Sequence, residues 1–416
     1  MTKKHINFFF ASLLLLLQSN FLHAENTTIR GFSTVGLVKS NAGDSLNFRR
    51  NLARTAEDSN SWSFESDTTL GLQIDTVLND EWSASAQFVY KNRIDQNIEN
   101  SIEWAYLRYH PSPDNPFSYR VGRLGVDVFM LSEYRNVGYA YLWARPPIEF
   151  YSPLAFDYID GADITYSTLL EESFFQARLT VGTTQNDFVY DDVTLKVSPA
   201  IATSLLWESD YWKFRLGYAH IELSDRVDFY EPLIDALNSS APLWPEAASA
   251  ANDLNLEGKK FDYYTLGLTY DNNQWIVQTE INQVKTKDNI FTSSHSGYIS
   301  LGRRVGDYTL YGIGSIIENT DDINQVAAVP GFLPPLAQAQ LTGLRTVVQD
   351  QYNQTGVDQK SLGLGVRWDV YHNTAIKFQW DRTWIKPHGA GLWAKDSSIL
   401  TDETVDTFSI NVNFLF

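Results

Sequence analysis

The links between the predicted strands of this sequence alternate strictly between very short and long. After residue 24, apolar and polar side chains alternate within segments of a length that suits a tilted membrane-crossing strand. Short links of turn-forming residues, such as Asn79-Asp80 and Asn272-Asn273, are followed each time by long ones, such as 125–160. We predict sixteen strands, at 29–38, 68–78, 82–92, 101–110, 117–124, 161–169, 173–183, 193–208, 211–223, 261–271, 274–286, 296–304, 308–318, 360–371, 374–386 and 405–416.

This alternation predicts an all-β fold, a transmembrane antiparallel β-barrel. Short turns at one rim and long loops at the other are typical of outer-membrane barrels, with the turns periplasmic and the loops extracellular. An even number of strands returns both termini to the short-turn rim. A globular β-sandwich has no reason to keep such a strict alternation of link lengths.

The last predicted strand shows the two faces most clearly. One face carries Phe408, Ile410, Val412, Phe414 and Phe416, and the other carries Ser409, Asn411 and Asn413. We expect the apolar face to meet lipid and the polar face to meet water. Charges such as Arg367 and Lys377 would cost about 2–4 kcal/mol on the lipid side at the midplane, so they fix which face points inward.

Three tryptophans stand beside predicted short turns. Trp82, Trp212 and Trp275 each lie within a few residues of such a turn. An amphipathic ring at this position suits the lipid headgroup region, so we interpret the three as part of one aromatic girdle. The alternative is that each is a core tryptophan near the start of a strand.

The first 24 residues predict a secretory signal peptide. Lys3 and Lys4 precede an apolar run over 8–17, and a small-residue context for cleavage ends at Ala24. Removal of this segment takes the net charge from −18 to −20, because it contains two lysines and no acidic residue. We therefore expect a signal peptide at 1–24 and a single barrel domain at 25–416.

Composition argues against several classes of function. A chain this acidic is a poor ligand for nucleic acid, so we expect no nucleic-acid partner. Cysteine is absent, which excludes disulfides and thiolate chemistry. The histidines show no metal-ligand spacing, and no glycine-rich phosphate loop is present. We therefore predict no cofactor and no metal site.

The leader, the sixteen-strand rhythm, the terminal aromatic and the long third loop resemble the Gram-negative porin superfamily. The resemblance implies that Phe408, Ile410, Val412, Phe414 and Phe416 form the signal read by the barrel-assembly machinery. It also implies a homotrimer, surrounded by outer-membrane lipid and lipopolysaccharide, whose third loop folds into the lumen. The segment 132–147 departs from the acidic third loop that is usual in general diffusion porins, so no subfamily is assigned.

The third long link, 125–160, is predicted to form the narrowest part of a pore. It is rich in aromatic side chains, which would be unfavourable in a solvated loop, so we expect it to pack inside the barrel. Charges on the loop and on the facing wall would then filter polar solutes. The predicted constriction residues are Asp127, Glu133, Arg135, Arg145 and Glu149, and the predicted wall residues are Arg120, Arg178, Lys213, Arg215, Arg367 and Lys377. In the alternative interpretation, Arg135 and Arg145 pair with Glu133 and Glu149 and only fix the loop.

These observations predict a porin for passive diffusion of small hydrophilic solutes or ions, and no enzymatic activity. Sixteen strands leave room for an aqueous lumen. The alternatives are a non-conducting barrel that acts as a receptor or adhesin, and an outer-membrane hydrolase. For a hydrolase, the residues at hand are His295-Ser296, whose side chains should point to opposite faces of a strand, and Asp191-Asp192 with His220. The long loops 224–260 and 319–359 are interpreted as a flexible solvated rim, with receptor-like capping as the alternative.

The charge of the predicted loops gives an expectation for ion selectivity. The segments 184–192, 225–258 and 318–359 together carry a net charge of −13, whereas 125–150 carries only −1. Charges at the mouth act through water and are screened beyond about 10 Å at 0.1 M salt. We therefore expect weak cation selectivity in dilute salt that fades in concentrated salt.

Overall fold

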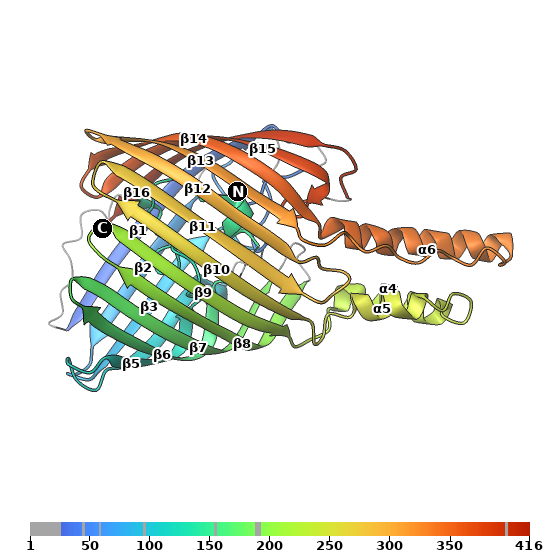
Figure 1. Ribbon diagram of the computed structural model, residues 1–416, viewed down its shortest axis with the longest axis horizontal. Coiled ribbons are helices and arrows are strands. Elements are labelled where there is room, and N and C mark those ends of the chain that lie inside the picture. The colour runs from blue at the N-terminus through green and yellow to red at the C-terminus, as the bar shows by residue number, and fades with distance from the viewer. Residues whose placement is uncertain are drawn as a thin grey trace, which may run out of the picture.

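A computed structural model describes residues 26–43, 46–57, 60–94, 97–153, 156–187, 193–395 and 398–416. The predicted signal peptide at 1–24 and the Asp191-Asp192 pair lie outside these residues. The described chain forms one closed antiparallel barrel, in which each strand pairs with its neighbours in sequence and β1 closes against β16 (Figure 1).

The sixteen predicted strands are confirmed. Each overlaps one strand of the structure, and several strands, such as β7 and β15, extend further toward the long-loop rim than predicted. Their bounds are β1 (Thr27–Ser40), β2 (Thr69–Val77), β3 (Trp82–Lys91), β4 (Ile102–Tyr109), β5 (Phe117–Gly125), β6 (Tyr158–Leu170), β7 (Ser173–Asp187), β8 (Thr194–Glu208), β9 (Trp212–Leu223), β10 (Lys260–Asp271), β11 (Trp275–Thr286), β12 (Ser294–Val305), β13 (Tyr308–Asn319), β14 (Val357–Tyr371), β15 (Thr374–Ala390) and β16 (Glu403–Leu415).

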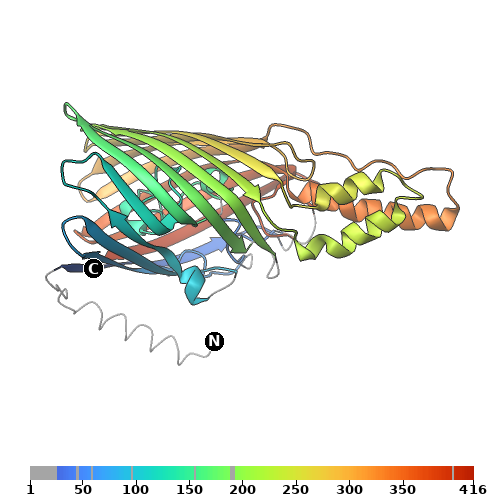
Figure 2. The ribbon, with the colours of Figure 1, turned by 90° about the horizontal axis from the view of Figure 1, so that it is seen from below.

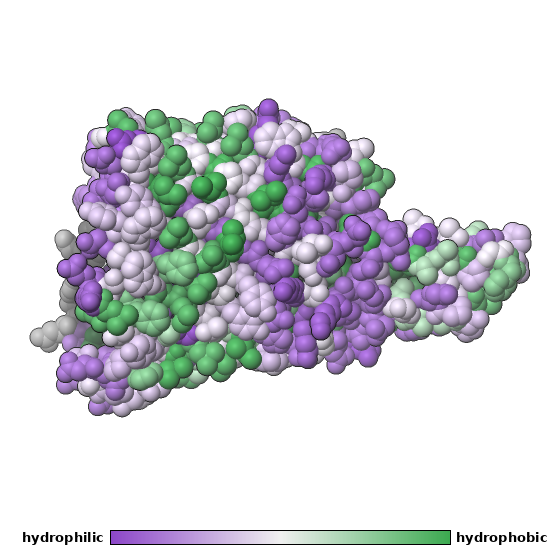
Figure 3. All heavy atoms as spheres, in the orientation of Figure 1, coloured by the Kyte–Doolittle hydropathy of each residue, from purple (hydrophilic) through white to green (hydrophobic). Residues whose placement is uncertain are grey.

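The side-chain alternation sets the faces of the barrel as predicted. Leu364, Phe378 and Phe408 are among the exposed apolar residues, whereas Lys377 and Asn411 on the alternate positions are buried inside. The register pairs Arg367 with Lys377, so two charged side chains share the inner face. Figure 3 shows the outer face with a hydrophobic band toward the short-turn rim and a hydrophilic surface toward the long loops.

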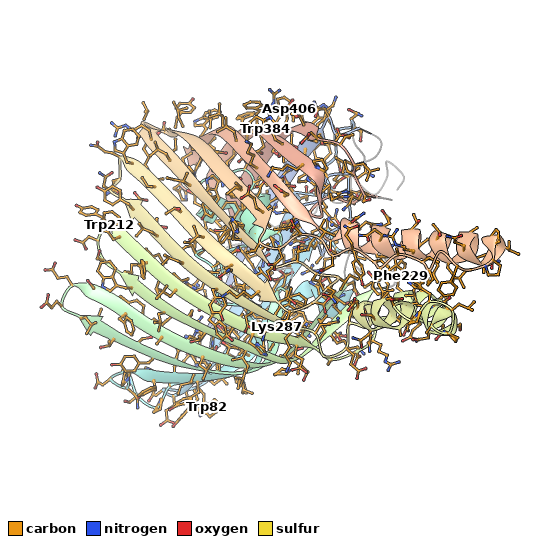
Figure 4. All side chains as sticks on the ribbon, turned by 45° about the vertical axis from the view of Figure 1, so that its right-hand side comes forward. Trp82, Trp212, Phe229, Lys287, Trp384 and Asp406 are labelled. Carbon is orange, nitrogen blue, oxygen red and sulfur yellow. The ribbon has the colours of Figure 1, made fainter. Side chains whose placement is uncertain are left out.

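The three tryptophans lie where an aromatic girdle requires them. Trp82, Trp212 and Trp275 are each about 40% exposed at the short-turn rim. Trp82 packs against Tyr109, and Trp212 packs against Tyr270, on neighbouring strands. Figure 4 shows Trp82 and Trp212 on the outside of the barrel at this rim, so the interpretation as core residues is wrong.

Among the described residues, no helix is both long enough and apolar enough to cross a membrane.

Three helices extend beyond the long-loop rim, where the sequence analysis placed a flexible solvated rim. The fifth loop contains η2 (Asp228–Tyr230), α4 (Glu231–Ser240) and α5 (Ala247–Leu254), and the seventh contains α6 (Pro335–Gln354). Figure 2 shows them side by side as one projection. Leu237, Trp244 and Val348 are fully buried there. The interpretation as a flexible solvated rim was wrong, because these segments form helices that bury apolar side chains.

Candidate functional site

The third loop, residues 126–157 between β5 and β6, crosses the lumen and lies against the opposite wall. Thr265 of β10 donates a hydrogen bond to the Val128 carbonyl at 2.7 Å. The Trp143 indole donates to Ser300 of β12 at 2.7 Å. Asn411 of β16 donates to the Ala144 carbonyl at 2.6 Å. The prediction that this loop folds inward is therefore confirmed.

Glycine makes room for this close approach at two places. A Cβ at Gly217 on β9 would lie 2.6 Å from the Val128 carbonyl oxygen, so the wall needs glycine where the loop first meets it. At the far end of the crossing, a Cβ at Gly138 would lie 2.3 Å from the hydroxyl of Thr34 on β1. Gly138 begins a short turn, η1 (Gly138–Ala140), that is pressed against the wall. The path of the loop is thus shaped by the absence of side chains.

Asp127 fixes the start of the loop to the wall. Its carboxylate accepts hydrogen bonds from Arg178 at 2.6 Å and from Ser204 at 2.9 Å, and it forms an ion pair with Arg215. Burial acts to raise the pKa of Asp127, but Arg215 and Arg178 together hold it at about 2. The carboxylate is therefore ionised, and its partners offset the cost of removing three charges from water.

Two cations of β14 and β15 bind backbone carbonyls in the middle of the loop. The Lys377 ammonium is fully buried and donates to the carbonyls of Gly138 at 2.6 Å, of Trp143 at 2.9 Å and of Tyr141. Arg367 donates to the carbonyls of Tyr139 at 2.8 Å and Tyr141 at 3.0 Å. These donors satisfy carbonyls that a non-helical, non-sheet segment would otherwise bury unpaired.

Arg145 and Glu149, two of the predicted constriction residues, are buried with partners from other segments. Arg145 pairs with Asp67 of the first loop at 3.0 Å and lies over the Phe48 ring. Glu149, in the short helix α3 (Ile148–Tyr151), accepts hydrogen bonds from Ser315 at 2.8 Å, Gln359 at 2.7 Å and Ser361.

The alternative pairing of arginines with glutamates inside the loop is therefore wrong. Arg135 lies 3.8 Å from Glu103 and 3.9 Å from Asp157, and Glu133 lies 3.5 Å from Arg178. Apart from Asp157, which belongs to the same loop, these charged partners lie on strands, and nothing in the sequence around the loop indicates them.

Two predicted wall residues lie away from the loop anchors. Arg120 forms an ion pair with Asp163 on the neighbouring strand and stacks on Tyr106. Lys213 lies 3.3 Å from Glu208, beside a short turn. Both belong to the inner face of the barrel, because Trp212 and Val121 beside them are exposed on the outer face.

A cavity of about 90 Å³ lies between the third loop, the first loop and strands β1 to β3. Its charged lining residues are Arg50, Arg54, Lys91, Arg135 and Asp157. Lys91 donates to Asp157 at 2.8 Å, and Arg50 donates to the Tyr141 hydroxyl at 2.9 Å. We call this group of side chains the basic cluster.

Arg50 and Arg54 are not among the site residues predicted from the sequence. Both belong to the first loop, which carries three arginines within 49–54 of an otherwise acidic chain. This local excess of positive charge is the sequence feature from which a role for Arg50 and Arg54 in the site could have been predicted.

Cations outnumber carboxylates around this cavity. Burial acts to raise the pKa of Asp157, but Lys91, Arg135 and Arg54 hold it well below its usual range. The carboxylate therefore stays ionised among its neighbours. The described charged side chains that meet here are Arg50, Arg54, Lys91, Arg93 and Arg135, against Asp67, Glu103 and Asp157.

Residues considered for hydrolysis do not form a catalytic arrangement in the described part of the chain. His295 is exposed and Ser296 is buried, so the two point to opposite faces of β12. His220 instead lies 2.9 Å from Asp262 on the neighbouring strand. Among the described residues, no group of three or more His, Asp or Glu side chains is placed to hold a metal ion.

No family model and no curated protein matches the sequence. The structure, however, is similar to solved outer-membrane proteins. The anion-selective porin from Comamonas acidovorans aligns over 94% of this chain and 99% of its own, with 13% identity and a TM-score of 0.54. The outer membrane channel DcaP of Acinetobacter baumannii aligns over 96% and 100%, with 8% identity and a TM-score of 0.53.

A third similar structure is the outer-membrane expressed OmpT of Vibrio cholerae, which aligns over 95% of this chain and 100% of its own. Its identity is 10% and its TM-score is 0.52. At such low sequence identities, structural similarity is evidence for a shared fold only. The chain forms a closed sixteen-stranded antiparallel β-barrel, and this fold is similar to that of these outer-membrane proteins.

Proposed function

We propose that this protein is an outer-membrane porin that conducts small hydrophilic solutes, with a narrow passage that favours anions. The observation that carries the proposal is the basic cluster, in which Arg50, Arg54, Lys91 and Arg135 line a cavity between the third loop, the first loop and the wall. Charges at a constriction act on a solute at short range, where salt screens them least. A passage with more cations than carboxylates stabilises an anion in transit.

The anchors of the third loop have a different part in this proposal. Asp127, Arg145, Glu149, Arg367 and Lys377 hold the loop in place and so set the size of the passage. Of the five predicted constriction residues, Arg135 is the one that lines the cavity of the basic cluster. Filtering and anchoring are thus assigned to different side chains.

The similar structures support a channel. They include an anion-selective porin and an outer membrane channel, and OmpT of Vibrio cholerae has been solved in a trimer form. We extend these features to this chain as proposals. We propose a homotrimer in outer-membrane lipid and lipopolysaccharide, exported by the signal peptide at 1–24 and recognised by the barrel-assembly machinery through the residues 408–416. No enzymatic role is proposed.

The test is single-channel recording of the purified protein in a planar bilayer. We expect discrete conductance steps and, in a gradient of concentrated KCl, a reversal potential on the anion side. Absence of any steps from correctly folded protein would overturn the channel. A strongly cation-selective reversal potential in concentrated salt would overturn the role of the basic cluster.

The helical projection supports a second candidate, a receptor or adhesin. Phe332 and Leu336, at its outer end, are 85% and 74% exposed. Exposed apolar residues on an ordered projection are a common feature of contact surfaces. Folded protein that inserts into bilayers but conducts no current would favour this candidate over the channel.

A further inference from the structure

The lumen on the long-loop side of the third loop has an apolar wall, which is unusual for a water-filled barrel. Inward positions near the outer ends of β9 and β10 carry Ile221, Leu223, Phe261 and Tyr263. Further toward the short turns, the same inner face carries charged side chains such as Arg215. The polar pattern of the inner face therefore stops partway along these strands.

These side chains surround a cavity of about 300 Å³, which we call the vestibule. Three loops also line the vestibule. They contribute Tyr230 from the fifth loop, Phe291 from the sixth loop and Trp393 from the eighth loop. Phe229 also lines it, and Figure 4 shows this residue where the helical projection meets the barrel. An apolar cavity of about 150 Å³ holds one benzene ring, so this volume suits an apolar body of about two rings.

Positive charge is concentrated at one end of the vestibule. Arg49 and Lys395 both line the cavity. Arg49 donates to the carbonyls of Leu392 at 3.0 Å and Gly391 at 2.9 Å, and the Lys395 ammonium donates to those of Gln354 at 3.1 Å and Ala390 at 2.9 Å. Three of these four carbonyls belong to the consecutive residues Ala390, Gly391 and Leu392, so both cationic groups lie near the end of β15.

Lys395 forms no ion pair with a carboxylate of the described residues, and its ammonium is held by backbone carbonyls instead. Asp350 of α6 is the carboxylate that acts on the pKa of Lys395. It accepts hydrogen bonds from Ser398 at 2.7 Å and from Gln354 at 2.7 Å. Burial and Arg49 lower the pKa of Lys395 to about 7, against the opposing effect of Asp350. An anionic group beside Lys395 would relieve that unfavourable environment.

We propose that the vestibule is a binding site for small amphipathic organic anions, with an apolar body of one or two rings against Ile221 and Phe261 and a carboxylate or sulfonate at Arg49 and Lys395. The site rests on the proposed function, because it would supply the bound anion to the passage below. Arg49 lines the vestibule, and the next residue, Arg50, lines the cavity of the basic cluster. An anion that leaves the vestibule therefore meets a second cation one residue along the same loop.

The test is equilibrium binding of 2-naphthoate to the full-length protein in detergent, followed by calorimetry and by quenching of tryptophan fluorescence, since Trp393 lines the site. We expect saturable binding of 2-naphthoate, at least about tenfold weaker binding of the uncharged 2-naphthamide, and no saturable binding of the polar anion gluconate. Partition of the probe into detergent is not saturable, so it does not imitate the expected result.

Two variants separate the charge from the apolar wall. Lys395→Gln should weaken 2-naphthoate binding toward that of 2-naphthamide, because only Arg49 then remains, and should leave 2-naphthamide binding unchanged, whereas Ala219→Phe should fill the cavity and weaken both. The matched control is Lys386→Gln, because Lys386 is an exposed cation that pairs with Glu318 and Asp358. Heat-dependent gel mobility confirms that each variant is folded.

The outcomes distinguish this site from the channel. Conductance without saturable 2-naphthoate binding would overturn the vestibule site alone. Binding without conductance would overturn the channel and leave the site. Equal affinity of wild type and Lys395→Gln for 2-naphthoate would overturn the anion-binding end, and unchanged binding in Ala219→Phe would overturn the location.

Discussion

The Asp127 carboxylate of the third loop accepts a hydrogen bond from the Arg178 guanidinium of β7 at 2.6 Å, and both side chains are buried inside the barrel. Ser204 and Arg215 complete the surroundings of the same carboxylate. The charge pattern that looked like a filter in the sequence thus includes a structural clamp at the point where the loop enters the lumen.

Asp127→Asn should loosen the third loop, because it leaves Arg178 and Arg215 buried without a countercharge. Loss of one partner of a buried ion pair costs about 3–5 kcal/mol. We expect a lower midpoint of urea unfolding in detergent and faster protease cleavage within 126–157. The control is Glu133→Gln, since Glu133 is exposed and its 3.5 Å contact with Arg178 should contribute at most about 1 kcal/mol. Equal effects of the two variants would contradict the clamp.

Acid should release the same clamp only at low pH. The pKa of Asp127 is lowered from 3.8 to about 2 in the folded protein, where burial opposes the larger combined effect of Arg215 and Arg178. A depressed pKa gives stability that is present above the unfolded value and is lost as pH falls through the folded value, here on the order of 2 kcal/mol. Protease resistance of the loop should therefore be unchanged from pH 7 to pH 4 and fall toward pH 2, when measured with pepsin at the acidic end. Asp127→Asn should lack this acid transition.

The barrel could be predicted from the sequence because the alternation of apolar and polar side chains within each strand is a local pattern. In β15, Ile376, Phe378 and Trp380 alternate with Lys377, Gln379 and Asp381, and no other register keeps Lys377 out of lipid. The helices α4 and α6 were missed for the opposite reason, because their core is not local in the sequence. Their apolar residues become a core only when the two loops meet, although Pro232 and Pro335 stand at the helix starts, where proline is favoured.

The partners inside the lumen could not be predicted, because they are distant in sequence. Asp67 pairs with Arg145 and with Arg50, and nothing around any of these residues indicates that they share a lumen. The vestibule was missed because Phe261 and Tyr263 are apolar and face inward, while the alternate positions Lys260 and Asp262 are charged, which reverses the pattern expected of a porin strand.

Arg135→Ala and Arg145→Ala should have different effects. Arg135 lines the cavity of the basic cluster, so its loss should shift the reversal potential in concentrated salt toward cations. Arg145 is buried against Phe48 and Asp67, so its loss should lower thermal stability with little change in selectivity. Reversal potentials in planar bilayers and heat-dependent gel mobility measure the two effects. A selectivity shift in Arg145→Ala as large as that in Arg135→Ala would show that filtering and anchoring are not separate.

Selectivity of the wild type should change with salt concentration. The Debye length is about 30 Å at 0.01 M and about 3 Å at 1 M, so the acidic outer loops dominate only in dilute salt. We expect weak cation preference at 0.01 M KCl and anion preference at 1 M KCl. Replacement of Asp228, Glu231 and Asp235 in the fifth loop by their amides should remove the cation preference in dilute salt and leave the result at 1 M unchanged. Selectivity that stays the same across this range would contradict a separation between mouth and passage.

Assembly in cells should depend on the ring of Phe416. The backbone of Phe416 exchanges two hydrogen bonds with Gly31, at 2.6 Å and 2.9 Å, which close the seam between β16 and β1. Phe416→Ala keeps both hydrogen bonds and removes only the terminal aromatic, whereas deletion of Phe416 removes both. If the ring is the signal read by the assembly machinery, each variant should accumulate in the periplasm.

Refolding of urea-denatured protein into detergent, which needs no machinery, separates recognition from stability. Phe416→Ala should refold to the heat-modifiable form with normal yield, because the seam is intact, while its outer-membrane level in cells falls severalfold. Phe332→Ala, which changes an exposed phenylalanine of the helical projection, serves as the control and should assemble normally. Normal outer-membrane levels of Phe416→Ala would show that the ring is dispensable. A parallel loss of refolding in detergent would instead assign its effect to the seam, where the Phe416 ring packs over Gly31.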